Sequence, residues 1–386
     1  MAPKKKTASA PTAPKQAENS TAGNVDKVVA GDLRKQIAAI NKGLSESIQG
    51  LPVFGVNEDG VQDFSIKLFS TGILALDKAL NGGLPCGRIT ELFGEEQSGK
   101  SLIAMVAAGQ LQKKGGRVLL FDAEQAYTPE WAEKLGMDTS NIMISDNNIV
   151  EDIMEISKKY AEAHLVDLII VDSLGALMSR DIATSDIGAP KYGGIALPLS
   201  RCIPPMISVL KRNNVNMILI NQVRDVVGAY VPMLKTPAGR AIKHAYHTRI
   251  QVYKAKSADY LKTGEVETGV EIGTKVIKHR GGPNHTIANF RIDYKLGFDK
   301  VYDVIQLLLD EKLITKAGSF YTYGEQKYQG LEALLTAFRN DPVAYESSRK
   351  FAEELLNKEV SPNVSSGVST VAAEEEVLPV KPEEKE

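Results

Sequence analysis

The sequence has 386 residues, of which 43% are hydrophobic and 24% charged, and its formal net charge is −2. This composition is typical of a globular protein with a large core, and it excludes a polycation that binds nucleic acid through overall charge. The chain has no apolar run of the roughly 18 residues that a membrane span needs and no signal-peptide pattern. Its two cysteines, Cys86 and Cys202, cannot build a disulfide framework or a zinc motif. We therefore expect a cytoplasmic protein with no membrane association.

The two ends of the chain differ in charge from its middle. Residues 1–28 are predominantly basic, residues 358–386 are predominantly acidic, and both are rich in Ala, Pro, Ser and Thr. Such segments bury too little apolar surface to fold, so we predict two disordered tails. Residues 29–62 contain a short helix with one apolar face, over 32–44, followed by a polar linker. A helix this short is not stable alone, so it should dock on another surface.

Residues 63–298 alternate between helix and strand patterns, which predicts an α/β domain. After a short first helix, strands are expected over 89–93, 118–121, 168–171 and 217–220, and helices over 100–112, 129–135 and 149–163. This alternation predicts a mostly parallel sheet with helices on both faces. Three more strands, over 250–253, 272–277 and 288–294, are predicted to add antiparallel to the sheet edge.

Residues 299–357 are predicted to form a separate, small α+β unit. A helix is expected over 302–311, a hairpin over 320–327 and two further helices over 331–338 and 344–356.

Eight consecutive residues form a phosphate-binding motif. They are Gly94, Glu95, Glu96, Gln97, Ser98, Gly99, Lys100 and Ser101, and they match G-x-x-x-x-G-K-[ST] in full. A predicted strand precedes the motif and a predicted helix follows it, the context in which backbone N–H groups wrap nucleotide phosphates. We expect Lys100 to reach the β- and γ-phosphates of ATP and Ser101 to bind Mg²⁺. The alternative is a glycine-rich turn with a solvated lysine, which would require the full spacing to be accidental.

Two carboxylates follow predicted strands close to this motif. Asp172 ends the strand over 168–171, and the carboxyl ends of parallel strands face the nucleotide crevice. We therefore expect Asp172 to bind Mg²⁺, directly or through water, with a helix N-cap as the alternative. Glu124 follows the strand over 118–121, where a carboxylate would orient or deprotonate an attacking water. Acids at strand ends are common, so residue type alone leaves that role open.

Beyond these motifs, an ordered set of segments resembles the bacterial RecA recombinase family. The matching segments are residues 84–89, 121–124, 166–173, 220–224, 278–280 and 311–318. The resemblance implies a RecA-type P-loop ATPase core with an N-terminal docking helix and a small C-terminal domain. It also implies a DNA-dependent ATPase that forms a helical homo-oligomeric filament on single-stranded DNA and catalyses homologous pairing and strand exchange with duplex DNA. Loading or mediator proteins are implied as further partners, and repair and the SOS response as the setting.

The resemblance also assigns roles to single residues. Glu124 is similar to the family's catalytic carboxylate, and Gln222 to the residue that senses the γ-phosphate. Lys278 and Arg280 are similar to a basic pair that reaches the ATP of the neighbouring subunit, which would complete the site only in the filament. Without the resemblance, these two residues would be interpreted as solvent-exposed cations on an edge strand. The helix over 32–44 is similar to the family's N-terminal helix, which packs head-to-tail on the adjacent protomer.

Two basic, glycine-containing segments, residues 180–194 and 224–243, lie where the family has its DNA-binding loops. Their basic residues would hold DNA phosphates through sequence-independent, salt-sensitive contacts. These residues are Arg180, Lys191, Arg224, Lys235, Arg240 and Lys243. The glycines that would allow close backbone approach are Gly193, Gly194 and Gly239. Tyr192 and Val227 stand where the family inserts apolar side chains between base triplets. Two surface loops without DNA are the alternative.

Several positions depart from the family's pattern, which indicates a divergent member. Trp131 stands where the family stacks a tyrosine on adenine, and it offers the same apolar face. Leu197 and Pro204 replace family arginines, and Pro198, Pro204 and Pro205 are predicted to interrupt the helix after the first loop. Two rival functions stay open, a ring-forming motor on the same core and a recombination mediator that binds ATP without robust hydrolysis. The sequence also leaves open whether a bacterium or a phage encodes the chain.

Overall fold

The computed structural model describes residues 66–185, 194–225, 234–235, 239–255, 262–263 and 266–360. The helix predicted over 32–44, the linker after it, the basic tail and residues 361–386 of the acidic tail lie outside the described residues. Within the described ranges, no helix is both long enough and apolar enough to cross a membrane.

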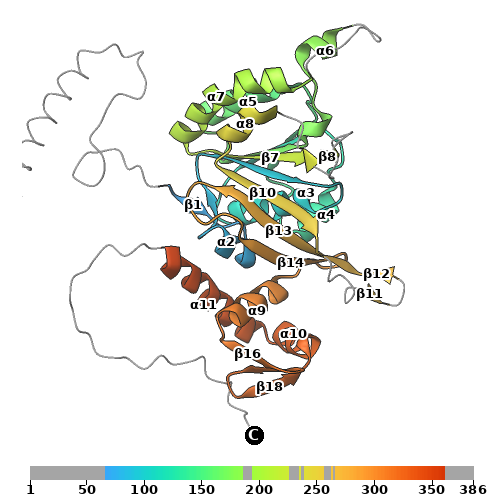
Figure 1. Cartoon of the computed structure of the whole chain (residues 1–386), viewed down its shortest axis with the longest axis vertical. Coiled ribbons are helices and arrows are strands. Elements are labelled where there is room, and N and C mark those ends of the chain that lie inside the picture. Colours follow the sequence, from blue (N-terminus) through green and yellow to red (C-terminus); the bar gives the residue numbers. More distant parts are fainter. Residues whose placement is uncertain are drawn as a thin grey trace, which may run out of the picture. The chain divides into compact units, whose positions relative to one another are not determined.

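A nine-stranded sheet forms the centre of the described chain, in the order β15-β14-β13-β10-β3-β7-β6-β4-β5 (Figure 1). Its strands are β3 (Ile89–Gly94), β4 (Val118–Asp122), β5 (Ile142–Ser145), β6 (Leu168–Asp172), β7 (Asn216–Gln222), β10 (Thr248–Lys254), β13 (Gly269–His279), β14 (Ile287–Asp293) and β15 (Gly297–Phe298). The strands from β10 to β5 run parallel, which confirms the predicted mostly parallel sheet. The short edge strand β5 was not predicted.

Strand β10 corrects one sequence prediction. Residues 250–253 were expected to add antiparallel to the sheet, but β10 pairs in parallel with β3 and antiparallel only with β13. The chain leaves β7, passes through helix α8 (Gly239–Ala245) and returns beside β3 in the same direction. A crossover of this kind favours a parallel strand, a property of the connection that strand composition does not reveal.

Helices cover both faces of the sheet. Besides α8 they are α2 (Leu74–Ala79), α3 (Lys100–Gln112), α4 (Pro129–Lys134), α5 (Val150–Glu162), the 3₁₀ turn η1 (Leu174–Ala176) and α7 (Ala196–Asn213). The short helix α6 (Arg180–Thr184) covers neither face, since none of its residues is buried. In β6, Leu168 and Ile170 join one apolar cluster with α3, whereas Ile169 and Val171 join a second cluster with α5 and α7. This alternation follows from the two-residue period of a strand. Because both of its faces are buried, β6 is apolar from Leu168 to Val171.

Helix α7 corrects the prediction of an interrupted helix after the first loop. It runs without a break through Pro204 and Pro205. Both prolines lie on the exposed side of α7, so the carbonyl groups that lose an N–H partner there can bond to water. Pro198 lies in the first turn, where a backbone N–H has no helical acceptor in any case. The buried face of α7 packs on α5 and carries the helix past the prolines.

Among the described residues, three two-stranded antiparallel ladders lie outside the main sheet. They pair β1 (Leu68–Phe69) with β2 (Leu84–Pro85), β8 (Arg224–Asp225) with β9 (Leu234–Lys235), and β11 (Lys262–Thr263) with β12 (Val266–Glu267).

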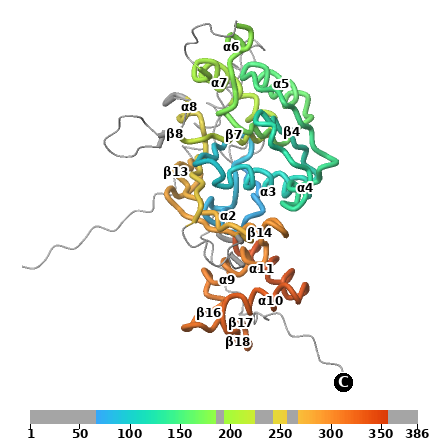
Figure 2. Tube along the Cα trace, turned by 90° about the vertical axis from the view of Figure 1, so that its right-hand side faces the viewer, coloured from blue at the N-terminus to red at the C-terminus, as the bar shows by residue number. Residues whose placement is uncertain are grey.

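Residues 300–360 form a small α+β unit, seen in orange and red in Figure 2. Its elements are α9 (Lys300–Asp310), β16 (Ile314–Ala317), β17 (Phe320–Tyr323), β18 (Gln326–Gln329), α10 (Leu331–Asn340) and α11 (Pro342–Val360). The three strands form one antiparallel sheet, where the sequence predicted only a hairpin. The unit has its own apolar cluster, which also takes in Leu74 of α2.

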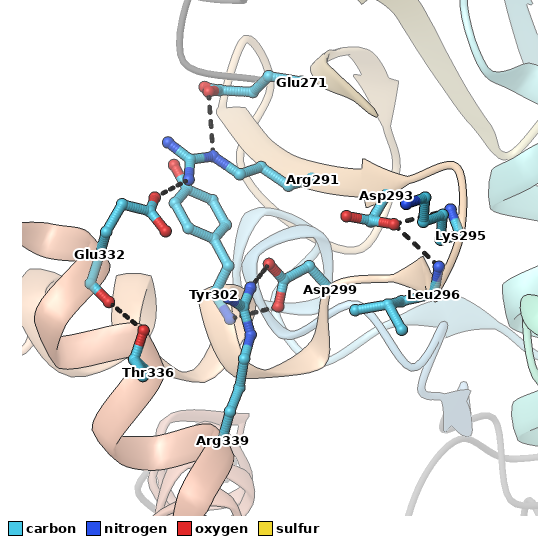
Figure 3. Close-up of polar contacts among 10 residues, drawn as sticks. All are labelled: Glu271, Arg291, Asp293, Lys295, Leu296, Asp299, Tyr302, Glu332, Thr336 and Arg339. Atoms are coloured by element: carbon cyan, nitrogen blue, oxygen red, sulfur yellow. Dashed lines mark hydrogen bonds and ion pairs between the residues drawn. The ribbon is translucent and has the colours of Figure 1, made fainter. Parts of the chain in front are cut away.

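Polar contacts connect this unit to the rest of the fold. Asp303 of α9 is fully buried. Its carboxylate accepts hydrogen bonds from the backbone N–H groups of Leu74 (2.6 Å) and Ala75 (3.2 Å) at the start of α2. Figure 3 shows a second contact, in which the guanidinium of Arg291 lies between Glu271 and Glu332 and 3.9 Å from the ring centre of Tyr302. A third is the ion pair between Asp299 and Arg339, at 2.6 Å.

Candidate active site

A cavity of about 540 Å³ opens beside the phosphate-binding motif, at the carboxyl ends of the parallel strands. The residues that line it come mainly from the motif, from the C-terminal ends of β4, β6, β7 and β10, and from two aromatic side chains. These residues are Glu96, Gln97, Gly99, Lys100, Ser101, Leu102, Glu124, Trp131, Asp172, Ser173, Ile220, Gln222, Lys254, Val270 and Tyr294. The fold therefore brings together residues that are up to 198 positions apart in the sequence, from Glu96 to Tyr294.

The motif itself forms a tight turn between β3 and α3. Gly99 caps α3 in the left-handed conformation, with φ of 99°, which favours glycine. At Gly94, a Cβ atom would lie 2.0 Å from the carbonyl oxygen of Val252, so only glycine fits against β10. The N-terminus of α3, with its unpaired N–H groups, consequently faces the cavity as an anion site.

Lys100 lies within the motif that it is expected to serve. Its Nζ donates hydrogen bonds to the carbonyl oxygens of Glu95 (2.6 Å) and Gly94 (3.2 Å). Burial lowers the pKa of the Lys100 ammonium, while the charges of Asp172 and Glu124 oppose that shift. A cation in this position would be attracted to phosphate oxygens placed along the loop.

The two residues expected to bind Mg²⁺ are in direct contact. The Ser101 hydroxyl donates a hydrogen bond of 2.5 Å to the Asp172 carboxylate at the end of β6. Burial raises the pKa of Asp172 to about 6, and the charges of Glu124 and Asp122 add to that rise. A buried carboxylate beside other acids, with a hydroxyl next to it, fits the oxygen ligands that Mg²⁺ takes together with phosphate and water. The described residues hold no group of three or more His, Cys, Asp or Glu side chains that could ligate a metal without such help.

Glu124 lies one strand away, after β4. Its Oε1 atom accepts hydrogen bonds from the Ser173 hydroxyl and from the Gln222 side-chain amide, the latter at 3.0 Å. The structure thus places the two residues that the resemblance assigns to hydrolysis and to γ-phosphate sensing in contact with each other. Ser173, which directly follows Asp172 at the end of β6, was not given a role in the sequence analysis.

Two aromatic side chains line the cavity away from the strand ends. Trp131 of α4 was predicted to contact the base, and Tyr294, just after β14, was not. Tyr294 lies in no motif and is distant from the phosphate loop in sequence, so only the tertiary structure identifies it. Flat aromatic faces suit the stacking of a nucleotide base.

Lys278 and Arg280 do not line this cavity. The Lys278 Nζ donates to the backbone carbonyls of Lys243 (2.9 Å) and His244 (3.2 Å), and Arg280 donates to the same His244 carbonyl at 2.6 Å. Both cations therefore hold the C-terminal end of α8, the helix that contains the last residues, 239–243, of the predicted second DNA loop. Burial and the neighbouring Arg280 charge lower the pKa of Lys278.

A buried polar cluster that the sequence did not reveal connects β7, β3 and β10. The Glu91 carboxylate, which is not exposed, accepts from Arg249 (2.5 Å) and from the Asn221 amide (2.9 Å). The Arg249 guanidinium also lies 4.7 Å from the ring centre of Phe93. Asn221 directly precedes Gln222, and Arg249 pairs in register with Lys278. The cluster therefore lies between the Glu124–Gln222 contact and the contacts that Lys278 and Arg280 make with α8.

The predicted DNA-binding segments are described in part. Arg180 begins α6 and forms an ion pair with Asp152 of α5. In the β8–β9 ladder, Arg224 lies opposite Lys235. Most positions of both loops lie outside the described residues, among them Lys191, Tyr192, Gly193 and Val227. Of the remaining predicted residues, Gly194 lies in a turn before α7, and α8 contains Gly239, Arg240 and Lys243.

Comparison with known proteins adds an independent finding. Residues 33–299 match the family model described as the RecA N-terminal domain. The chain is 34% identical to protein RecA of Chlorobium chlorochromatii (strain CaD3) over 301 residues, which cover 77% of this chain and 84% of that protein. It is 35% identical to protein RecA of Thermus aquaticus over 298 residues, 76% of this chain and 87% of that protein. It is 31% identical to protein RecA of Aquifex pyrophilus over 334 residues, which cover 83% of this chain and 95% of that protein.

Proposed function

The chain belongs to the RecA family, and from this membership we infer that it is an ATP-hydrolysing DNA recombinase. Its activity is DNA-dependent ATP hydrolysis coupled to homologous pairing and strand exchange. The observation that carries the inference to this chain is the convergence of Glu124, Asp172 and Gln222 on one cavity beside a complete phosphate-binding motif.

We propose that ATP occupies the 540 Å³ cavity. Trp131 and Tyr294 would contact the base, and the N-terminus of α3 and Lys100 would hold the phosphates. Ser101 and Asp172 would hold Mg²⁺, which neutralises charge on the β- and γ-phosphate oxygens when bound. The oxygen-rich contact between Ser101 and Asp172 supports this assignment.

For the chemical step, we propose that Glu124 takes a proton from the water that attacks the γ-phosphorus. The bond from the γ-phosphorus to the bridging oxygen breaks, and its electron pair leaves with ADP. Gln222 senses the γ-phosphate, and Lys278 and Arg280 act on the ATP of the neighbouring subunit. The placement of both cations outside their own subunit's cavity supports that role in trans.

We propose that single-stranded DNA binds along the segments 180–194 and 224–243 in a helical filament of identical subunits, in the cytoplasm. Residues 29–62 would dock each subunit on the next, residues 63–298 would form the ATPase core, and residues 299–357 would meet incoming duplex DNA. Proteins that load the filament would be further partners.

The test is ATP hydrolysis with and without single-stranded DNA, at two salt concentrations. Wild type should show strong stimulation by DNA that weakens at high salt, because phosphate contacts are screened. Glu124→Gln should lose the stimulated rate while still binding nucleotide. Glu162→Gln, the same change at an exposed position at the end of α5, should behave as wild type.

Each rival function predicts a different result. Nucleotide binding without DNA-stimulated turnover in wild type would point to a recombination mediator that uses ATP as a structural ligand. Rings in electron micrographs of the protein with ATP and DNA would point to a ring-forming motor, whereas helical filaments are expected.

A further inference from the structure

Ser173 occupies a distinctive place in the site. It is the first residue after β6, it is only 1% exposed, and it lines the cavity. Its hydroxyl donates a hydrogen bond to Oε1 of Glu124, on the neighbouring strand end. Neither the motif nor the resemblance gives this serine a role.

The hydrogen bonds to Glu124 are unequal at its two oxygens. Oε1 accepts from both the Ser173 hydroxyl and the Gln222 amide. No hydrogen bond reaches Oε2 from the part of the chain that the structure describes. A carboxylate that is held through one oxygen by two donors has a fixed plane, and the lone pairs of its other oxygen stay available for a proton.

The two donors lie close to the η1 turn that follows Ser173. A Cβ atom at Gly175, in the η1 turn, would lie 3.5 Å from the Ser173 hydroxyl and 3.5 Å from the Gln222 side chain. A methyl group at position 175 would thus make ordinary van der Waals contact with both donors, so the Ser173 hydroxyl and the Gln222 side chain lie side by side at this turn. The Gln222 amide has two N–H groups, so it can hold Glu124 with one and meet a phosphate oxygen with the other.

We propose that Ser173 is a positioning residue for ATP hydrolysis. Together with Gln222 it fixes Glu124 through Oε1, so that Oε2 accepts the proton of the attacking water. The water oxygen forms the new bond to the γ-phosphorus, the bond to the bridging oxygen breaks, and the electron pair leaves with ADP. This inference rests on the proposed role of Glu124 as the base.

The experiment compares Ser173→Ala, Ser173→Thr and a matched control. Ser157 of α5 is also fully buried, and its hydroxyl has no hydrogen-bond partner among the described residues, so Ser157→Ala makes the same change where no bond is lost. The rate of DNA-stimulated hydrolysis, KM for ATP and the affinity for a non-hydrolysable ATP analogue are measured for each variant.

A positioning role predicts a loss in kcat without a loss in binding. Ser173→Ala should lower kcat by roughly tenfold or more, since general-base catalysis as a whole contributes about 10²- to 10⁴-fold. KM and analogue affinity should stay within about twofold. Ser173→Thr keeps the hydroxyl and should restore most of the rate, and Ser157→Ala should match wild type.

A second comparison separates action through Glu124 from a general structural effect. In the Glu124→Gln background, adding Ser173→Ala should cause no further loss, because residues that act as a unit are not additive. The inference is overturned if Ser173→Ala keeps the wild-type kcat, if Ser173→Thr is as slow as Ser173→Ala, or if the double variant loses a further factor of the same size. If Glu124→Gln alone keeps the wild-type rate, then Glu124 is not the base in hydrolysis, and Ser173 cannot act through it.

Discussion

The buried carboxyl of Asp303 predicts that this protein loses stability as the pH rises toward neutrality. Burial raises the pKa of Asp303 from 3.8 to about 7, hydrogen bonds from the backbone N–H groups of Leu74 and Ala75 oppose the rise, and the charge of Asp77 adds to it. Asp77 is also fully buried, and burial raises its pKa to about 6. Both groups lie where α9 meets α2, so their ionisation acts on the contact between the C-terminal unit and the core.

The sign follows from the two proton affinities. In the unfolded chain Asp303 loses its proton near pH 3.8, whereas in the folded chain it keeps the proton up to about pH 7. Between these values the folded state binds more protons, so the contribution of Asp303 to stability is fully present below about pH 4 and is lost as the pH rises to about 7. At 1.36 kcal/mol per pKa unit, the full shift of about three units corresponds to about 4 kcal/mol.

The assay is urea unfolding at pH 5 and pH 8 for wild type, Asp303→Asn and Asp310→Asn. Asp303→Asn removes the titration but keeps only one acceptor for the two N–H groups, which costs about 1–3 kcal/mol for the group left unpaired. At pH 5 this variant should therefore be less stable than wild type, and the difference should shrink or reverse at pH 8. Asp310→Asn changes an exposed aspartate of the same helix and should follow wild type. Parallel pH profiles of wild type and Asp303→Asn would refute the reasoning.

Three further predictions concern the site and its support. Gly94→Ala should weaken nucleotide binding and destabilise the fold by about 1–3 kcal/mol, measured by analogue binding and urea unfolding, because its Cβ would meet a backbone carbonyl of β10. Arg249→Met should lower the free energy of unfolding by about 3–5 kcal/mol, because it leaves the buried Glu91 charge unpaired. Adding Glu91→Gln should recover much of that loss. Equal stability of the single and double variants would contradict this prediction. Lys278→Ala should speed hydrogen exchange in α8 in the absence of DNA, because the last carbonyl groups of the helix lose a hydrogen-bond donor. Unchanged exchange in α8 would show that this contact does not stabilise the helix.

The phosphate loop was predictable from the sequence because its function depends on local geometry. The glycines, the lysine and the serine lie within eight residues, and the strand before them and the helix after them are contiguous in the chain. Helix α3 has the predicted bounds, 100–112, and most strands of the sheet lie within two residues of their predicted limits at either end. Apolar runs bounded by turns are enough to place such elements, since burial on both faces selects them.

The prediction about the prolines of α7 was wrong for a physical reason that lies outside the local sequence. Proline removes a hydrogen bond and strains the preceding turn, which favours a break in an isolated helix. Here Leu199, Ile203 and Met206 are buried against the core on the opposite face. Tertiary packing of that face outweighs the local preference.

The sequence by itself determined that this chain binds a nucleotide through a P-loop in an α/β fold, because those signals come from residues that are neighbours in the chain. Only the tertiary structure decided which acids and amides meet in the cavity beside the P-loop. Glu124, Ser173 and Gln222 are far apart in sequence, and the strand order β7-β6-β4 places their strand ends side by side. That order is set by crossover connections and by burial of both sheet faces, which act over the whole domain. The same cause gave β10 its direction and brought Lys278 and Arg280 to the end of α8.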